Sequence, residues 1–416
     1  MLDKIKNVLD VRRHEDDKIK EFIFNLFLGM VVILFFIFLR DTAIRQGIIN
    51  SWFDKYISLR FDSDTETKRI ANEIVFLDFD NTSIEELKRP DLTPRNKVAD
   101  LVRIAYEREA KLIIIDMNFS EADYSPTKLL AGDKTDLNGE SRDKILYELL
   151  ETIKNDDVKN TKIFIPFITY ADQYEKPNIF SNLIDNKKIY SITSTFTANN
   201  LNDWNVRFWL PYLKTKKLDT EESHLLWSIP IMTMALTIGN VEELKLFEKL
   251  ILNDDNVDNE SYTLNLRRQD KEEIFTFYEE QYKKQGLIRD TQSNQYNRIQ
   301  YTILPPNVKP LEPFGNIPAK HIGHWRENKS KLDNERIDCN GKIVIIGRAD
   351  DNCDDLHATP IGVMPGMYIH GNSIATILSK TQPHLTSISK HLIIEIILVI
   401  IASYMFLLIP QKTQSI

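Results

Sequence analysis

The sequence is poor in cysteine and lacks a long run of basic residues, and both absences exclude classes of protein. Its 416 residues include only two cysteines, too few for a zinc site of their own or a disulfide scaffold. The 53 basic and 61 acidic residues give a net charge of −8, and no basic stretch follows the first twenty residues. We therefore expect no nucleic-acid partner. The 42% of hydrophobic residues is ordinary for a globular protein.

Two intensely apolar segments lie at opposite ends of the chain. Residues 22–39 carry no charge, and residues 392–409 carry only Glu395, whose carboxylate can reach the membrane interface or meet another helix. A helix of this length nearly crosses a hydrocarbon core of about 30 Å. The first segment has no small-residue cleavage site after it, so we interpret it as a retained anchor. A third apolar run, 225–239, is shorter and contains Pro230, which predicts a buried helix of a folded domain.

Basic residues predict how these anchors are oriented. Six of them precede residue 22 while only Arg40 and Arg45 follow the first anchor closely, which places the N-terminus in the cytoplasm. Charges around the second anchor favour the opposite orientation weakly, but the first helix usually dominates. We therefore expect a plasma-membrane protein in five parts: a cytoplasmic segment 1–21, transmembrane helix 22–39, an extracytoplasmic domain 40–390, transmembrane helix 391–410 and a cytoplasmic tail 411–416.

The segment between the anchors has the pattern of an α/β protein. Continuous apolar runs that predict buried strands occupy residues 70–80, 111–119, 161–170 and 341–347. Helical patterns occupy residues 93–110, with Thr93 as N-cap, and residues 142–154, 317–328 and 370–380. Residues 202–213 alternate like an exposed or antiparallel strand, and 242–300 are charged and helix-prone. We expect a mixed, mainly parallel sheet flanked by helices.

Charged residues gather where the predicted strands end. Asp78, Asp80 and Asp116 end two strands, and an acidic loop, 348–360, follows the last. Because the carboxyl ends of parallel strands form the crevice where ligands bind, these acids should converge. Residues flanking the same edge in sequence are Arg95, Asp355, His357 and His370. This cluster could bind a ligand or a divalent cation, or it could be a self-satisfied polar network that fixes loops to the sheet.

One short motif suggests an enzyme. VFLDFDNTS, residues 75–83, resembles the first motif of haloacid dehalogenase-like phosphatases. The resemblance implies that Asp78 attacks phosphorus, that Asp80 acts as general acid, and that both help to hold magnesium. The chain departs from that family at Arg348, where its fourth motif has an acid, and it lacks a convincing third-motif lysine. An extracytoplasmic phosphatase therefore stays as an alternative.

A resemblance over nearly the whole outer segment points elsewhere. Four blocks, at residues 73–121, 202–213, 224–239 and 341–380, are similar to the type-two CHASE domain, the cyclase/histidine-kinase-associated sensory extracellular domain of bacteria. The last block is the most specific, with its KIVIIG strand, the Ala-Thr-Pro tripeptide at residues 358–360 and His370. The matching positions are Asp78, Asp80, Pro94, Arg95, Asp116, Gly347, Asp355, Thr359, Pro360, Gly366 and His370. The resemblance implies signal reception rather than catalysis, adds Thr359 to the candidate cluster, and names no ligand, metal or cofactor.

Family members usually continue into a cytoplasmic effector, whereas this sequence ends at QKTQSI. We therefore expect a sensor subunit that is anchored in the lipid bilayer and acts on a separately encoded effector. A homo-oligomer is one form that it could take. A scaffold that assembles a membrane complex without a ligand is a further alternative. Cys339 and Cys353 would lie outside, where they either form a disulfide or stay as two buried thiols.

Overall fold

The structure is a computed structural model. It describes residues 69–86, 93–119, 142–167, 175, 178–194, 196–198, 206–209, 212–216, 222–238, 241–253, 262–268, 271–277, 299, 301, 303–304, 317–318, 338–351 and 353–379. All of them belong to one of the two compact units of the chain, Trp52–Ile288 with Gln292–Pro383. In these ranges no helix has the length and apolar character to cross a bilayer. The predicted membrane helices, 22–39 and 391–410, lie outside the described residues.

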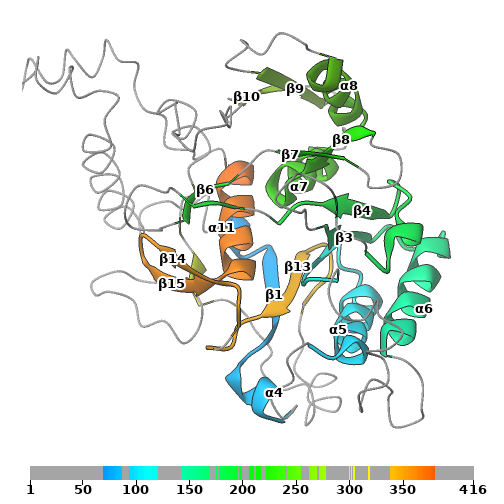
Figure 1. Cartoon of the computed structure of the whole chain (residues 1–416), viewed down its shortest axis with the longest axis vertical. Coiled ribbons are helices and arrows are strands. Elements are labelled where there is room, and N and C mark those ends of the chain that lie inside the picture. The colour runs from blue at the N-terminus through cyan, green and yellow to red at the C-terminus, as the bar shows by residue number, and fades with distance from the viewer. Residues whose placement is uncertain are drawn as a thin grey trace, which may run out of the picture. The chain divides into compact units, whose positions relative to one another are not determined.

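A five-stranded parallel sheet forms the centre of this unit (Figure 1). Its strands are β1 (Ile74–Phe79), β2 (Leu112–Asp116), β3 (Lys162–Pro166), β4 (Ile189–Ile192) and β13 (Ile343–Arg348). Their order is β1-β13-β2-β3-β4, so the strand that comes last in the sequence lies between the first two. The four predicted strands and the mainly parallel α/β fold are thereby confirmed.

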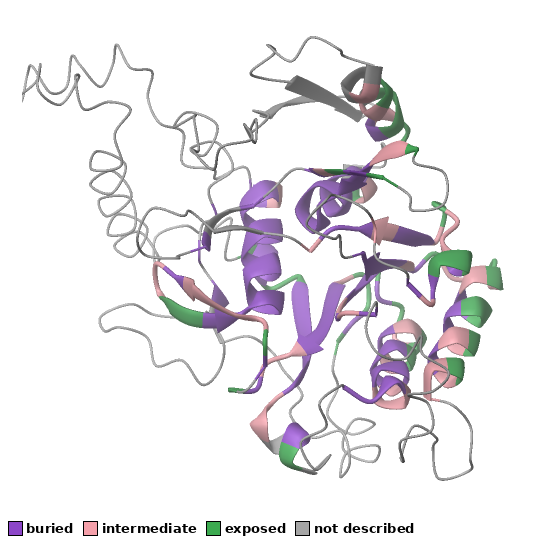
Figure 2. Ribbon diagram, viewed as in Figure 1, coloured by how far each residue is buried: buried purple, intermediate pink, exposed green. Residues whose placement is uncertain are grey.

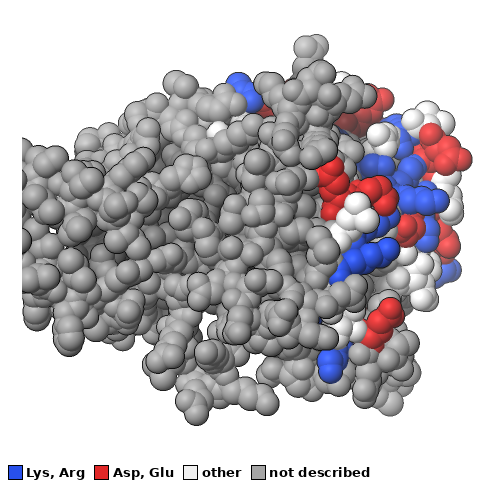
Figure 3. All heavy atoms as spheres, turned by 90° about the horizontal axis from the view of Figure 1, so that it is seen from above, with Lys and Arg blue, Asp and Glu red and all other residues white. Residues whose placement is uncertain are grey.

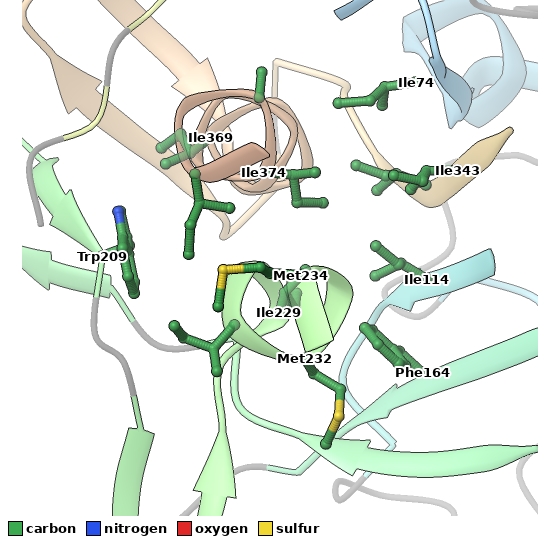
Figure 4. Close-up of a cluster of buried hydrophobic side chains, with 14 of the residues drawn as sticks. Ile74, Ile114, Phe164, Trp209, Ile229, Met232, Met234, Ile343, Ile369 and Ile374 are labelled. Carbon is green, nitrogen blue, oxygen red and sulfur yellow. The ribbon is translucent and has the colours of Figure 1, made fainter. Parts of the chain in front are cut away.

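Helices cover both faces of the sheet, which is why its strands are apolar without interruption. Alternate strand residues such as Val75 and Leu77 pack with α5 (Arg95–Glu107) and α6 (Arg142–Asn155). On the other face, Figure 4 shows strand residues such as Ile74 beside α7 (Ile229–Ile238) and α11 (Gly366–Ser379). The sheet and α11 are buried nearly throughout, whereas α6 is exposed on its outer side (Figure 2).

The helix α11 runs antiparallel to β1. Its Tyr368 contacts Asp78 near the end of β1, and a Cβ atom built at Gly371 would come within 2.4 Å of Phe76, two residues earlier in the strand. The first turn of α11 therefore lies at the carboxyl edge of the sheet, and the helix proceeds toward the amino edge, where β1 begins.

Smaller elements surround the sheet. Antiparallel pairs are formed by β5 (Phe196–Ala198) with β6 (Val206–Trp209), β7 (Tyr212–Lys216) with β8 (Ser223–Trp227), β9 (Tyr262–Arg268) with β10 (Lys271–Phe277), and β14 (Leu356–Thr359) with β15 (Gly362–Pro365). The other elements are α4 (Asn81–Glu86), η1 (Ser181–Leu183), α8 (Val241–Asn253) and the parallel pair β11 (Ile303–Leu304) and β12 (Ile317–Pro318). The antiparallel pairing predicted for 202–213 is confirmed, although two strands share this segment.

Several predicted helices need correction. Among the described residues of the segment 242–300, α8 is the only helix and the β9–β10 hairpin follows it, because cross-strand pairing overrides local propensity. Residues 317–318 form β12 rather than the start of a helix. Leu225–Trp227 end the strand β8, so the buried helix begins only at Ile229. The N-cap of α5 is Pro94 instead of Thr93, because the Pro94 carbonyl accepts the first helical hydrogen bond, from Val98.

The outer surfaces of the helices carry charges of both signs. On α5 the Asp100 carboxylate lies 3.5 Å from Lys97 Nζ and 3.3 Å from Arg103 Nη1. Figure 3 shows basic and acidic side chains intermingled on the described part of one face. Exposed pairs of this kind contribute about 0 to 1 kcal/mol each, so the buried layers hold the fold together.

Candidate functional site

Three residues in register cross the carboxyl edge of the sheet. Asp78 on β1 lies opposite Gly347 on β13, which lies opposite Asp116 on β2. A Cβ atom at Gly347 would come within 3.1 Å of both Cβ and Sδ of Met367. The missing side chain therefore lets the first turn of α11 approach the sheet between the two aspartates.

Tyr368 and His370, both on α11, each meet one of these aspartates. The Tyr368 hydroxyl donates a hydrogen bond of 2.7 Å to Asp78 Oδ2. Burial, reinforced by the Asp78 charge, raises the pKa of Tyr368, so the hydroxyl keeps its proton and remains a donor. Asp78 itself is only 3% exposed. This carboxylate thus ties α11 to β1.

Asp80 also has a structural partner. Its Oδ1 accepts hydrogen bonds from Ser83 N at 2.9 Å and from Ser83 Oγ at 2.7 Å, which caps the N-terminus of α4. Asp78 and Asp80 are not among the residues that line the cavity described below. Among the described residues, no three acids, histidines or cysteines are placed to hold a metal ion. The phosphatase roles of these two aspartates therefore find no support in this geometry.

Asp116 and His370 form a buried pair of a different kind. His370 Nε2 lies 3.6 Å from Asp116 Oδ1, and the side chains are 3% and 7% exposed, respectively. Burial, assisted by His357, lowers the pKa of His370 to about 3. Burial, assisted by Asp355, raises the pKa of Asp116 well above its usual value. The fold therefore favours a neutral imidazole beside a protonated carboxyl. Within the described part of the chain, Asp116 Oδ2 has no hydrogen-bond partner.

A cavity of about 340 Å³ opens at this edge of the sheet. It has the size of a small-molecule site. Its lining consists of Thr93, Arg95, Asp116, Met117, Asn118, Pro166, Ser194, Arg348, Cys353, Asp354 and Asp355. Thus three of the predicted site residues, Arg95, Asp116 and Asp355, do converge on one cavity.

The first of the two lining arginines, Arg95, is already held by its neighbours. Its Nη2 donates to the Asn118 carbonyl at 2.8 Å, and its Nε lies 3.5 Å from Asp143 Oδ1. The guanidinium also stacks on Phe119, 4.4 Å from the ring centre. These contacts fix Arg95, which is itself buried, in the wall of the cavity.

The second, Arg348, is held by a bidentate ion pair. Its Nε and Nη2 donate to Asp350 Oδ1 and Oδ2 at 2.7 and 2.8 Å. This hydrogen bonding raises the pKa of Arg348. Both arginines therefore have carboxylate partners that do not line the cavity, and the lining acids are left in excess.

Asp355 connects the cavity to α11. Its Oδ1 lies 2.7 Å from His357 Nε2, and its carbonyl accepts a hydrogen bond of 2.9 Å from Gly366 N. Any Cβ atom at Gly366 would collide with the Asp355 carboxylate, 2.1 Å from Oδ2. Glycine at the first position of α11 thus allows the carboxylate to pack there. Thr359 does not line the cavity, because its hydroxyl bonds to Gly362 O in the turn between β14 and β15.

The two cysteines are free thiols. Cys339 precedes β13 and Cys353 follows it, and both are buried. Burial raises the pKa of each thiol to about 11. Of the two alternatives left open by the sequence, the structure has the buried thiols, and Cys353 lines the cavity.

Sequence reasoning missed several residues of this site. Asn118 and Ser194 are each the second residue after a strand, β2 and β4, so the strand-end rule that predicted Asp116 would also have found them. Tyr368 gave no sequence signal, because its importance comes from the partner that it meets in the fold.

Comparison with known families gives one match. The model of the CHASE2 domain matches residues 30–408, a range that contains every described residue and the whole cavity. Comparisons with curated proteins and with solved structures yield no match.

Proposed function

Because the chain belongs to the CHASE2 domain family, a family of sensory extracellular domains, we propose that it is a membrane-anchored sensor. In this proposal, residues 22–39 and 391–410 cross the plasma membrane, both termini lie in the cytoplasm, and the domain between them lies outside. The cavity at the carboxyl edge of the sheet receives the signal, and the membrane helices pass it to a cytoplasmic effector on another chain. A second copy of the sensor is a candidate partner in that step.

The path of α11 is the observation that carries this proposal. Its first residue, Gly366, packs on Asp355, and its His370 faces Asp116, so the helix begins at two acids of the cavity wall. It ends at Ser379, ahead of the second predicted membrane segment. A ligand that binds better to one position of α11 than to another shifts the helix between these positions. Such a shift displaces Ser379, which the sequence connects to the second predicted membrane segment.

The opposite edge of the sheet supports the same proposal. The strand β1 begins at Ile74, at the amino edge toward which α11 runs. Both ends of the described domain therefore lie at the edge away from the cavity, as two anchors in a single membrane require.

Accessibility of a surface position tests the outer location. Val158 is 91% exposed, whereas the native cysteines are buried, so a Val158→Cys variant carries one thiol exposed on the surface of the domain. We expect a membrane-impermeant maleimide to label it in intact bacterial cells far faster than it labels the native chain, whose Cys353 is reached only through the cavity. A Lys6→Cys variant should react only after permeabilisation. Labelling of Val158→Cys only in permeabilised cells would contradict the proposal.

A further inference from the structure

We infer that the cavity binds a small organic cation, a molecule whose protonated amine lies between the Asp116 and Asp355 carboxyl groups. This inference rests on the proposed sensor function and names the chemical class of the signal. It follows from the charge of the cavity wall, from one buried oxygen atom, and from the size of the space.

The charge of the wall favours a cation. Arg95 and Arg348 line the cavity, but their positive charges are matched by carboxylates outside the lining. Asp354 and Asp355, the latter also hydrogen-bonded to His357, then leave the wall with an excess of negative charge when His357 is neutral. Attraction of a ligand cation is stronger in a cleft with low-dielectric walls than in bulk water.

The Asp116 side chain supplies a specific contact. Its Oδ2 is buried and has no hydrogen-bond partner among the residues that the structure describes. Buried carboxyl oxygens are normally hydrogen-bonded, and leaving one unsatisfied costs about 1 to 3 kcal/mol. A ligand N–H donor at this oxygen removes that cost. Because Asp116 lines the cavity, its carboxyl group borders the space that a ligand would occupy, and a ligand donor meets Oδ2 once the side chain turns toward it.

Binding of the amine exchanges a proton for the ligand. The fold favours the protonated form of Asp116, since burial and Asp355 raise its pKa. When the ammonium group binds, the carboxyl group releases its proton to solvent and becomes a carboxylate that accepts an N–H bond. One ligand cation enters and one proton leaves, so binding weakens by up to tenfold for each unit that the pH falls below the Asp116 pKa.

The volume limits the ligand to a small molecule. About 340 Å³ lies near the lower end of the range of small-molecule pockets. Thr93, Asn118 and Ser194 provide further polar groups in the wall. They can hydrogen-bond a hydroxyl or carbonyl group at the other end of the ligand.

Matched probes of equal length test the charge of the ligand. The full-length protein in detergent is titrated with 1,4-diaminobutane, with 1,4-butanediol and with succinate, alongside a panel of small primary amines and amino acids. We expect thermal stabilisation by amines and none by the diol or the dicarboxylate. Calorimetry in two buffers of different ionisation enthalpy should show protons released on amine binding, rising toward one per amine as the pH is lowered below the raised pKa of Asp116. The inference would be overturned if succinate or butanediol stabilised the protein as much as the diamine does. It would also be overturned if no amine stabilised the protein.

Two Asp→Asn variants provide the matched comparison. Asp116→Asn removes the carboxyl group from the cavity, and we expect at least a tenfold loss of amine affinity. Asp100→Asn removes an exposed carboxylate that does not line the cavity and should bind like the native chain. Native affinity in Asp116→Asn would overturn the inference.

A readout on the native chain covers the case in which Asp116→Asn does not fold. Cys353 lines the cavity while Cys339 is fully buried. An amine that enters the cavity should slow the reaction of Cys353 with methyl methanethiosulfonate and leave Cys339 unreactive throughout. Unchanged reaction of Cys353 at saturating amine would contradict the inference. The labelling of Val158→Cys does not depend on any amine, so it separates a wrong ligand class from a wrong sensor assignment.

Discussion

Replacing Asp116 by asparagine should change how the stability of the outer domain depends on pH. In the unfolded chain Asp116 titrates near 3.8 and His370 near 6.5. In the fold the pKa of Asp116 is raised and that of His370 is lowered to about 3. Where the pH is below 6.5 and below the raised pKa of Asp116, the unfolded chain therefore holds one proton on the histidine, and the folded chain holds one proton on the aspartate. Because both states bind the same number, the pair contributes little pH dependence there.

The variant loses this balance. Without the Asp116 carboxyl group, only His370 of the pair titrates. Because its pKa is lower in the folded chain than in the unfolded chain, the folded state is most stable above pH 6.5 and loses stability as the pH falls. Each pH unit between 6.5 and 3 then costs about 1.4 kcal/mol. Lowering the pH from 6.5 to 5 should reduce the free energy of unfolding by up to about 2 kcal/mol more in Asp116→Asn than in the native chain.

Urea denaturation of both full-length proteins in detergent measures this difference. Tryptophan fluorescence reports on the domain, because Trp209 and Trp227 are buried in it. All other titrating groups are shared, so the difference between the two pH profiles isolates the pair. Parallel profiles from pH 7 to pH 5 would refute the reasoning that Asp116 holds the proton in place of His370.

Two further variants test how α11 is seated. Tyr368→Phe removes only the hydroxyl group that donates to Asp78, and it should lower the free energy of unfolding by about 1.5 to 3 kcal/mol in the same denaturation assay. Unchanged stability would contradict this packing of α11. Gly371→Ala gains about 1 kcal/mol of helix propensity but places Cβ 2.4 Å from Phe76 Cζ, so overpacking of about 1 to 3 kcal/mol should make it less stable overall. Combination with Phe76→Leu should relieve the clash, and strictly additive effects would show that the ring is not the obstacle.

The central sheet could be predicted from sequence because its strands are continuous apolar runs bounded by charged residues. That pattern follows from burial on both faces, and it needs no knowledge of distant residues. The position of β13 between β1 and β2 could not be predicted, because strand order depends on contacts between segments far apart in the chain. The hairpin of β9 and β10 was missed for a similar reason, since each charged strand is stabilised by its partner.

The candidate site was predictable only as a neighbourhood. The strand-end rule placed Asp78 and Asp116 at the same edge, and the two are in fact in one register across β13. Sequence could not distinguish their environments, because α11 brings the Tyr368 hydroxyl to one and the His370 imidazole to the other. Only the packed helix makes one aspartate a structural contact and the other a wall of the cavity.

Affinity purification of the full-length protein from native membranes, with its partners identified by mass spectrometry, tests the central claim most directly. The sensor account predicts a cytoplasmic enzyme recovered in stoichiometric amount. Recovery of the protein alone, repeated under gentle solubilisation, would contradict the claim that it signals to a separate effector.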